Sequence, residues 1–278
     1  MPRLQVEPIV RAALAEDIRA GDITTEATVP PDLRAEAEMT AKQAGVIAGL
    51  EVAALVFSLL DTAVEFIPRV GEGEAVEPGR CVAEVRGPAR AILTGERVAL
   101  NFLQHLSGVA TRTRRFVELV AGTGAAITDT RKTTPGLRLL EKYAVRVGGG
   151  QNHRYALDDA ILIKDNHIAA AGGIRAAVER ARRRGGHTTV IEVETQNRAQ
   201  VEEALAAGAG IIMLDNMSPA AMRECVALIA GRAVTEASGG VNEETIRAIA
   251  ETGVDLISIG ALTHSVTALD ISLNIRAA

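Results

Sequence analysis

The stretch TVIEVETQNRAQVEEALAAGAGIIMLD, residues 189–215, decides the fold class. It opens with an apolar segment rich in β-branched residues, Thr189–Glu194, and closes with a second one, Ile211–Asp215. The Ala-rich segment between them has a helical pattern. Two nearly continuous apolar strands joined by a helix indicate a strand–helix–strand unit, in which the strands run parallel in a sheet that is covered on both faces.

The same unit repeats on both sides of this stretch. The later strands begin near residues 189, 211 and 233, which are 22 residues apart. The predicted strands are Ala126–Thr130, Ala160–Lys164, Thr189–Glu194, Ile211–Asp215, Ala233–Glu236 and Leu256–Ile259. Six or seven such units predict an α/β fold with a complete or open barrel of parallel strands. In a barrel of this kind, chemistry belongs at the carboxyl ends of the strands.

The first part of the chain has a different, mixed α+β character. Its predicted elements are a helix over Pro8–Asp17, a strand over Ala35–Lys42, a buried helix over Leu50–Leu60 and a strand over Ala63–Ile67. Residues 95–122 then predict one or two long amphipathic helices, with Gly108 as the break between them. We place the domain boundary at this break, which gives an N-terminal domain of residues 1–107 and a barrel of residues 108–265.

Composition excludes several classes of protein. The net charge of -5 gives no overall attraction to nucleic acid or to anionic membranes. The longest comparable apolar stretch, Val52–Leu60, is too short to span a bilayer, and the first residues lack the apolar run of a secretory signal. Cys81 and Cys225 have no second ligand at metal-site spacing. We therefore expect a cytoplasmic protein with no structural metal and with neither nucleic acid nor membrane as a partner.

Polar and charged residues stand at nearly every predicted strand end. The segments are Asp129–Lys132, Lys164–His167, Glu192–Glu194, Asp215–Asn216, Glu236–Gly240 and Ser258–Ala261. One charged strand end alone is usually a solvated rim, but six in succession indicate a site. The last two ends are rich in glycine and precede predicted helices, an arrangement that binds phosphate through backbone N–H groups. His264 either reaches the same anion or caps a helix.

A dense group of cations in this acidic protein points to a small polyanionic ligand. The group comprises Arg131, Lys132, Arg138, Lys142, Arg146, Arg154 and Lys164, together with His153. Glu194 and Asp215 are two carboxylates opposite this group. Paired carboxylates suit hydroxyl groups or a divalent cation, although either one alone could be a buried hydrogen-bond acceptor.

The stretch TRKTTPGLRLLEKYAVRVGGGQNHRYALDDAILIKDNH, residues 130–167, closely resembles the signature of the quinolinate phosphoribosyltransferases, also called carboxylating nicotinate-nucleotide pyrophosphorylases. Other blocks are similar to the family's in the same order: EDIRAGDITT, GERVALNFLQHLSGVATRT, EVET, LDN, EASGGV and SIGALTHS. The resemblance implies an N-terminal α/β sandwich domain, to which residues 266–278 return, and an open α/β barrel. It also implies a homodimer in which each sandwich domain covers the partner's barrel.

The resemblance further implies roles for individual residues. Quinolinate is expected to be held by Arg131, His153, Arg154 and Lys164, with Arg97 from the neighbouring subunit. Phosphoribosyl pyrophosphate is expected to contact Thr130, Lys132, Glu194, Asp215, Ser238, Gly239, Gly240, Ile259, Gly260, Ala261 and His264. The expected catalytic residues are Lys132, Lys164, Glu194 and Asp215. Magnesium is expected to bind through the substrate, with Glu194 and Asp215 as its candidate protein ligands.

The resulting expectation is phosphoribosyl transfer to quinolinate with decarboxylation, giving nicotinate mononucleotide, pyrophosphate and carbon dioxide in NAD biosynthesis. Three alternatives stay open at this point. Lys164 at the end of an apolar strand could serve a Schiff-base aldolase, the chain could be a molybdenum-associated relative of the same fold, or it could be a metabolite sensor without catalysis. The sequence also leaves open whether dimers assemble into hexamers and which residue assists decarboxylation.

Overall fold

The computed structural model describes residues 1–277, which form two compact units. The first unit contains Met1–Arg114, Thr133–Gly149 and residues 261–277, and the second contains Arg115–Lys132 and Gly150–Gly260. The domain limits drawn from the sequence, after residues 107 and 265, stay a prediction. Within the described residues, no helix is both long and apolar enough to cross a membrane.

The first unit is built on a four-stranded antiparallel sheet in the order β12-β1-β5-β3. Its strands are β1 (Arg34–Ala41), β3 (Glu65–Pro68), β5 (Cys81–Pro88) and β12 (Ile271–Ala277). A separate two-stranded sheet joins β2 (Gly45–Val46) to β4 (Ala75–Val76). Because β12 pairs with β1 along seven residue positions, the end of the described chain is part of the first unit's sheet.

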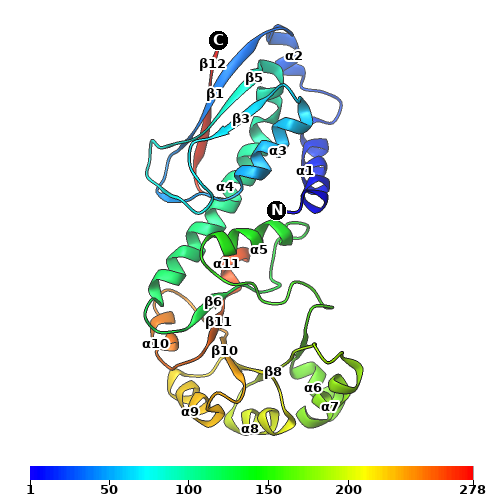
Figure 1. The fold of residues 1–278 in the computed structure, drawn as a ribbon, viewed down its shortest axis with the longest axis vertical. Helices are drawn as coiled ribbons and strands as arrows, with labels where there is room; N and C mark the ends of the chain where they lie inside the picture. Colours follow the sequence, from blue (N-terminus) through cyan, green and yellow to red (C-terminus); the bar gives the residue numbers. More distant parts are fainter. Residues whose placement is uncertain (278) are drawn as a thin grey trace. The chain divides into compact units, whose positions relative to one another are not determined.

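Helices accompany this sheet in the first unit, and α3 (Leu50–Leu60) lies against it (Figure 1). They are α1 (Arg3–Ile18), α2 (Ile23–Thr28), α3 (Leu50–Leu60), α4 (Ala89–Leu119), α5 (Arg138–Val147) and α11 (Ala261–His264). Alternate residues of β1 are buried, as expected for a strand with one face on the core. Apolar residues of α3, including Val52, Val56 and Phe57, are fully buried. The core of the first unit therefore lies between the sheet and the helices.

The predicted break at Gly108 is wrong, because α4 is one continuous helix of 31 residues. Gly108 instead allows the main chain at Thr267 and Ala268 to pass close to the helix. A Cβ at Gly108 would lie 2.3 Å from the carbonyl oxygen of Thr267 and 3.1 Å from Cα of Ala268. The first distance is shorter than real atoms approach and the second is tight, so a side chain at this position would displace the main chain at Thr267.

The second unit confirms the predicted parallel α/β fold with six strands. The sheet order is β6-β11-β10-β9-β8-β7, and all five pairings are parallel. The strands are β6 (Ala126–Thr128), β7 (Ile161–Ile163), β8 (Ile191–Thr195), β9 (Ile211–Asp215), β10 (Val234–Ser238) and β11 (Leu256–Ser258). Within residues 1–277, β6 and β7 each pair with one neighbouring strand, so the sheet is open between them.

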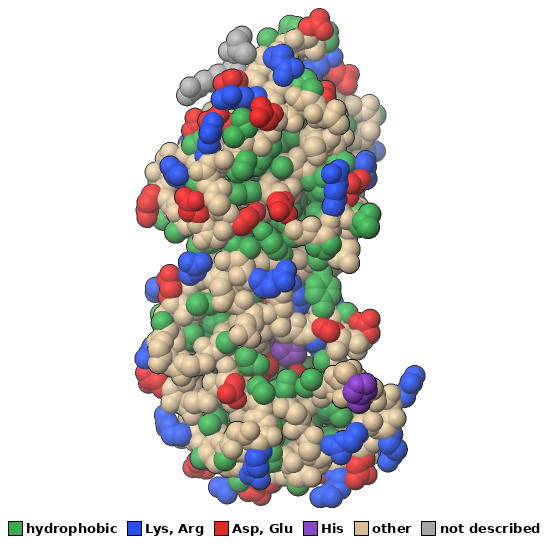
Figure 2. Space-filling view, in the orientation of Figure 1, with side chains coloured by type: hydrophobic (Ala, Val, Ile, Leu, Met, Phe, Trp, Pro, Cys, Tyr) green, Lys and Arg blue, Asp and Glu red, His purple; other side chains and the backbone are tan. Residues whose placement is uncertain are grey.

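Helices connect these strands: α6 (Asp165–Ala171), α7 (Ile174–Arg184), α8 (Arg198–Ala207), α9 (Pro219–Ile229) and α10 (Ile246–Ala250). Several begin with side-chain caps, since Asn197 accepts a hydrogen bond from the N–H of Gln200 and Ser218 accepts one from Ala221. Acidic and basic side chains are interspersed on the face of the molecule shown in Figure 2. That face carries no extended surface of a single charge.

Candidate anion-binding site

The strand register places the acidic strand-end residues on one face of the second unit's sheet. Glu194 of β8 pairs with Met213 of β9, which pairs with Glu236 of β10, and Asp215 pairs with Ser238. Paired residues of parallel strands face the same side, and so do alternate residues of one strand. The residues that share this face include Glu192, Glu194, Asp215, Glu236 and Ser238.

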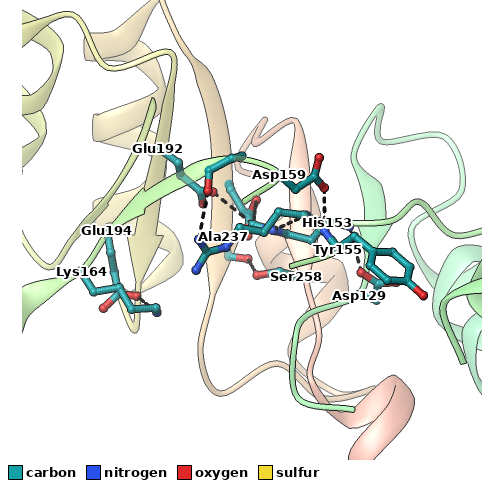
Figure 3. Close-up of polar contacts among 12 residues, drawn as sticks. Asp129, His153, Tyr155, Asp159, Lys164, Glu192, Glu194, Ala237 and Ser258 are labelled. Atoms are coloured by element: carbon teal, nitrogen blue, oxygen red, sulfur yellow. Dashed lines mark hydrogen bonds and ion pairs between the residues drawn. The ribbon is translucent and has the colours of Figure 1, made fainter. Parts of the chain in front are cut away.

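Two of the predicted site residues meet at the ends of neighbouring strands. Lys164 follows β7, and its Nζ forms an ion pair and a hydrogen bond with Glu194 near the end of β8 (Figure 3). The Lys164 side chain is 44% exposed and that of Glu194 is 12% exposed. An ion pair this accessible to water contributes only about 0–1 kcal/mol to stability. The Lys164–Glu194 ion pair is therefore better explained by ligand binding at the strand ends than by stabilisation of the fold.

His153 is less exposed and contacts two buried carboxylates, of which Glu192 is labelled in Figure 3. Its Nε2 is 3.2 Å from Glu192 Oε2 and 3.5 Å from Glu236 Oε2, and both glutamates are almost fully buried. Burial opposes the charged form of the ring, whereas hydrogen bonds with Glu192 and Glu236 favour it and raise the pKa of His153. Burial also raises the pKa of Glu192, and the nearby charge of Glu236 acts in the same direction.

The sequence places Glu192 and Glu236 among the polar strand ends, but it assigns neither of them a role in the site. Each precedes a predicted site residue by two positions, Glu194 and Ser238 respectively. The period of two along a strand was therefore the signal that placed them on the same face. Their contact with His153 had no such signal, because the histidine lies outside the regular strands.

The segment that carries His153 runs beside β6. Gln151 donates its N–H to the carbonyl of Ile127 at 2.8 Å, and Asp129 donates its N–H to the carbonyl of Gln151 at 3.2 Å. The Asp129 carboxylate is fully buried and accepts hydrogen bonds from Asn152 Nδ2 at 2.6 Å and from the N–H of His153 at 2.9 Å. The main chain at His153 is thus fixed to the end of β6.

Arg154 engages the other nitrogen of the His153 ring. The N–H of Arg154 donates to Nδ1 at 2.8 Å, and Arg154 Nη1 donates to the carbonyl of Ala160 at 3.0 Å. While Nδ1 accepts this hydrogen bond, it has no proton of its own, which opposes the charging effect of the two carboxylates. Because the hydrogen bond is a direct geometric constraint, we place the ring's proton on Nε2. A hydrogen bond from this ring to a ligand requires one of these contacts to be released.

Arg154, one of the guanidinium groups expected to bind the ligand, lies in an environment that disfavours its charge. Burial lowers the pKa of Arg154, and the nearby charge of Arg131 lowers it further. Each effect disfavours the charged form of Arg154, and each is relieved by an anion. This part of the second unit therefore suits a ligand with more than one negative charge.

The cluster of His153, Glu192 and Glu236 also has the composition of a metal site. One ligand atom from each residue lies within 4.8 Å of the others. A metal ion binds an imidazole nitrogen that has no proton, and here Nε2 holds the proton because Nδ1 accepts from Arg154. Glu194 and Asp215 offer the oxygen donors that Mg²⁺ prefers, and Asp215 already accepts a hydrogen bond from Asn216 Nδ2 at 2.9 Å.

The turns after β9 and β10 depend on left-handed residues. Asn216 has φ 53°, and Gly239 and Gly240 have φ 88° and 64°. The N–H of Asn216 donates to the carbonyl of Ser238 at 2.9 Å, so the two turns lie side by side. A Cβ on Gly239 would lie 2.2 Å from Asn216 Oδ1. Consecutive residues in such conformations turn backbone N–H groups toward one side, which suits an anion.

The remaining predicted residues fall into two groups. Thr130 and Lys132 follow β6, where the Thr130 hydroxyl accepts the N–H of Lys132 at 3.0 Å, and Ile259 donates its N–H to the carbonyl of Thr128 at the end of β6. Gly260 is the last residue of the second unit. Arg97, Ala261 and His264 belong to the first unit. The ligand roles expected of all these residues stay predictions.

Acidic and basic groups gathered at one end of a parallel sheet define a class, the α/β enzymes that act on small polyanions. Comparison with known proteins gives the family. The model of the quinolinate phosphoribosyl transferase C-terminal domain matches residues 109–274, and that of the N-terminal domain matches residues 22–107. The chain belongs to the quinolinate phosphoribosyl transferase family.

Individual relatives agree with this assignment over nearly the whole chain. A protein of Bacillus subtilis, named a probable carboxylating nicotinate-nucleotide pyrophosphorylase, is 48% identical and is matched over 99% of this chain and 95% of its own length. A decarboxylating quinolinate phosphoribosyltransferase of Nicotiana tabacum is 42% identical, with 99% and 83% covered. The crystal structure of NadC from Streptococcus pyogenes superposes with a TM-score of 0.97 at 45% identity, covering 100% of this chain and 99% of that one.

Proposed function

We propose that the protein transfers the phosphoribosyl group of phosphoribosyl pyrophosphate to quinolinate, with release of pyrophosphate and carbon dioxide, to give nicotinate mononucleotide for NAD biosynthesis. Relatives with 42–48% identity over 99% of the chain are named for this activity, which supports the proposal. The structural observation that supports it is the group of cations and carboxylates at the strand ends, where Lys164 pairs with Glu194 and where burial and the nearby charge of Arg131 lower the pKa of Arg154. A dicarboxylate bound here would offset the unfavourable charge that Arg131 exerts on Arg154.

Substrate choice follows from these two arginines. Quinolinate has two carboxylates, whereas nicotinate has one and would leave a partly desolvated guanidinium without its counter-charge. We therefore expect a strong preference for quinolinate in kcat/KM. Equal turnover of the two acids would contradict the role given to Arg131 and Arg154.

The reaction needs charge stabilisation at two places. When pyrophosphate leaves, positive charge develops at the anomeric carbon of the ribose, and the pyridine nitrogen attacks that carbon. The nitrogen becomes positively charged and can then accept the electron pair left when carbon dioxide departs, after which the ring carbon takes up a proton. In this proposal Glu194 and Asp215 stabilise the positive charge at the ribose, while Lys132 and Lys164 neutralise the anionic groups of the substrates.

Three further parts of the proposal go beyond the family assignment. Bound magnesium would neutralise the pyrophosphate leaving group, and the oxygen donors of Glu194 and Asp215 fit such an ion. We also propose a homodimer in which Arg97 completes the site of the partner subunit, with further assembly into hexamers left open. The cytoplasmic location expected from the sequence is also part of the proposal.

One assay tests the reaction. Purified protein with quinolinate, phosphoribosyl pyrophosphate and Mg²⁺ is expected to form nicotinate mononucleotide, followed by chromatography, and an equal amount of carbon dioxide from carboxyl-labelled quinolinate. Addition of borohydride with a carbonyl substrate distinguishes the aldolase alternative, which requires a trapped imine on Lys164. Absence of product from quinolinate and from nicotinate would overturn the proposed function.

A further inference from the structure

Three buried carboxylates contact His153, and we call Asp129, Glu192 and Glu236 the acidic cradle. Figure 3 shows Asp129 and Glu192 beside the histidine. Asp129 directly follows β6, Glu192 belongs to β8 and Glu236 belongs to β10. Their exposed fractions are 0%, 2% and 1%. Three acidic side chains from separate strands therefore converge on a single histidine in the interior of the second unit.

The cradle fixes both parts of His153. The Asp129 carboxylate accepts the main-chain N–H of His153 at 2.9 Å. The two glutamates face Nε2 of the ring, at 3.2 Å and 3.5 Å. With the main chain fixed from one strand and the ring from two others, the imidazole has one preferred orientation.

That orientation extends to Arg154. The ring's second nitrogen, Nδ1, accepts the N–H of Arg154 at 2.8 Å, and the Arg154 guanidinium donates to the carbonyl of Ala160 just before β7. The position of the Arg154 main chain is therefore coupled to the ring of His153. Rotation of the ring would break the contact at Nδ1.

Stability alone does not explain the cradle. Within residues 1–277, Oε1 of Glu192 and Oε1 of Glu236 are buried and have no hydrogen-bond partner. Burying carboxylates is unfavourable, and apolar side chains of similar volume often stabilise a core as well or better. Groups retained at such a cost are expected to serve the orientation of a functional residue.

We propose that the acidic cradle is a set of positioning residues for Arg154. The cradle holds the His153 ring with its proton on Nε2, the ring holds the Arg154 main chain through Nδ1, and the guanidinium is thereby pre-organised for a carboxylate of the substrate. The substrate part of this inference rests on the proposed function. The coupling between the cradle, the ring and Arg154 can be tested without it.

The first test is spectroscopic and uses the full-length protein without substrate. Histidine rings are labelled with ¹⁵N, and the His153 signals are assigned by their loss in His153→Asn. We expect a neutral ring at neutral pH with its proton on Nε2. A proton on Nδ1, whether alone or together with Nε2, would break the contact with Arg154 and overturn the proposal.

The second test is kinetic. Glu192→Gln and Glu236→Gln keep the shape of each side chain but remove its charge. We expect the KM for quinolinate to rise about tenfold, as for the loss of one hydrogen bond to a charged group, while the KM for phosphoribosyl pyrophosphate stays within about twofold. Equal changes in both KM values, or no change in either, would overturn the positioning role.

Glu141→Gln is the matched control. Glu141 is also fully buried and also pairs with a histidine, since His105 Nε2 lies 2.8 Å from its Oε1, but it belongs to the first unit. This variant is expected to lower the melting temperature without raising the KM for quinolinate relative to that for phosphoribosyl pyrophosphate. Wild-type protein without activity on quinolinate would refute the proposed function, whereas the spectroscopic result would still decide the inference about the ring.

Discussion

Gly239 and Gly240, which follow β10, offer a matched pair of substitutions. Both have positive φ values, 88° and 64°, that residues with side chains rarely adopt. The space around them differs, because a Cβ on Gly239 would lie 2.2 Å from Asn216 Oδ1, whereas nothing lies within 4 Å of a Cβ on Gly240. Gly240→Ala therefore adds backbone strain alone, and Gly239→Ala adds strain and overlap.

The two costs can be worked out separately. A left-handed residue with a side chain costs about 1–2 kcal/mol, which is the loss expected for Gly240→Ala. Gly239→Ala also displaces the Asn216 side chain, whose Nδ2 donates to Asp215 Oδ2 at 2.9 Å. Because Asn216 is exposed to water, losing this hydrogen bond adds about 1 kcal/mol. We therefore expect about 2–3 kcal/mol for Gly239→Ala.

Urea unfolding followed by circular dichroism gives the free energy of unfolding of each variant. The comparison requires that this free energy depends on urea concentration with the same slope in both variants. Steady-state kinetics supply a second readout. Displacement of Asn216 removes the hydrogen bond that it donates to Asp215. We therefore expect the KM for phosphoribosyl pyrophosphate to rise more in Gly239→Ala than in Gly240→Ala. An equal loss of stability in both variants would refute the argument from overlap. An unchanged KM in Gly239→Ala would refute the role of this turn in binding phosphate.

Three other predictions concern separate parts of the chain. Lys164→Arg keeps the charge but replaces a compact ammonium with a planar guanidinium, so we expect kcat to fall about a hundredfold. The control Lys42→Arg, at an exposed position, should leave kcat unchanged. Near-normal turnover in Lys164→Arg would mean that Lys164 has a structural role. Arg97→Ala and Lys132→Ala homodimers should each be inactive, and subunit exchange should restore about a quarter of wild-type activity, because about half the dimers are mixed and each has one intact site. A mixture that stays inactive after verified exchange would remove the shared site. Asp22→Ala should lower the free energy of unfolding by about 1 kcal/mol at neutral pH, because Asp22 caps α2. Hydrogen bonds from the hydroxyl and N–H of the capped residue lower the pKa of Asp22, so its contribution is present above the unfolded-state pKa and is lost as pH falls through the folded-state pKa. A difference from wild type that persists at about pH 2 would contradict this origin.

Local patterns predicted the regular elements well where apolar segments have clear limits. The bounds of α3, Leu50–Leu60, and of β9, Ile211–Asp215, are those expected from the sequence. Gly49, with φ 103°, precedes α3, and Asp61 follows it in an extended conformation. Such limits are local properties of the chain, and the parallel sheet follows from the repeated alternation of strand and helix.

Local sequence patterns did not predict which strands pair when they are far apart in the chain. The sequence indicates that Ala35–Lys42 is a strand, but the antiparallel pairing of β1 with β12 joins segments far apart in the chain. Gly108 shows a related limit, because a glycine inside a helical pattern suggests a break. Its actual role depends on the approach of Thr267, which no local pattern contains.

The candidate site was partly predictable for a physical reason. Strand-end residues share a face through the period of two, so Glu194 and Ser238 could be placed together, and the same period extends inward to Glu192 and Glu236. The inner pair contacts His153, which lies in an irregular segment without such a period. In our proposal, the inner residues Glu192 and Glu236 orient His153, and the outer residues Glu194 and Ser238 face the ligand. Substitutions of the inner residues should raise the KM for quinolinate more than that for phosphoribosyl pyrophosphate, whereas substitutions of the outer residues should lower kcat.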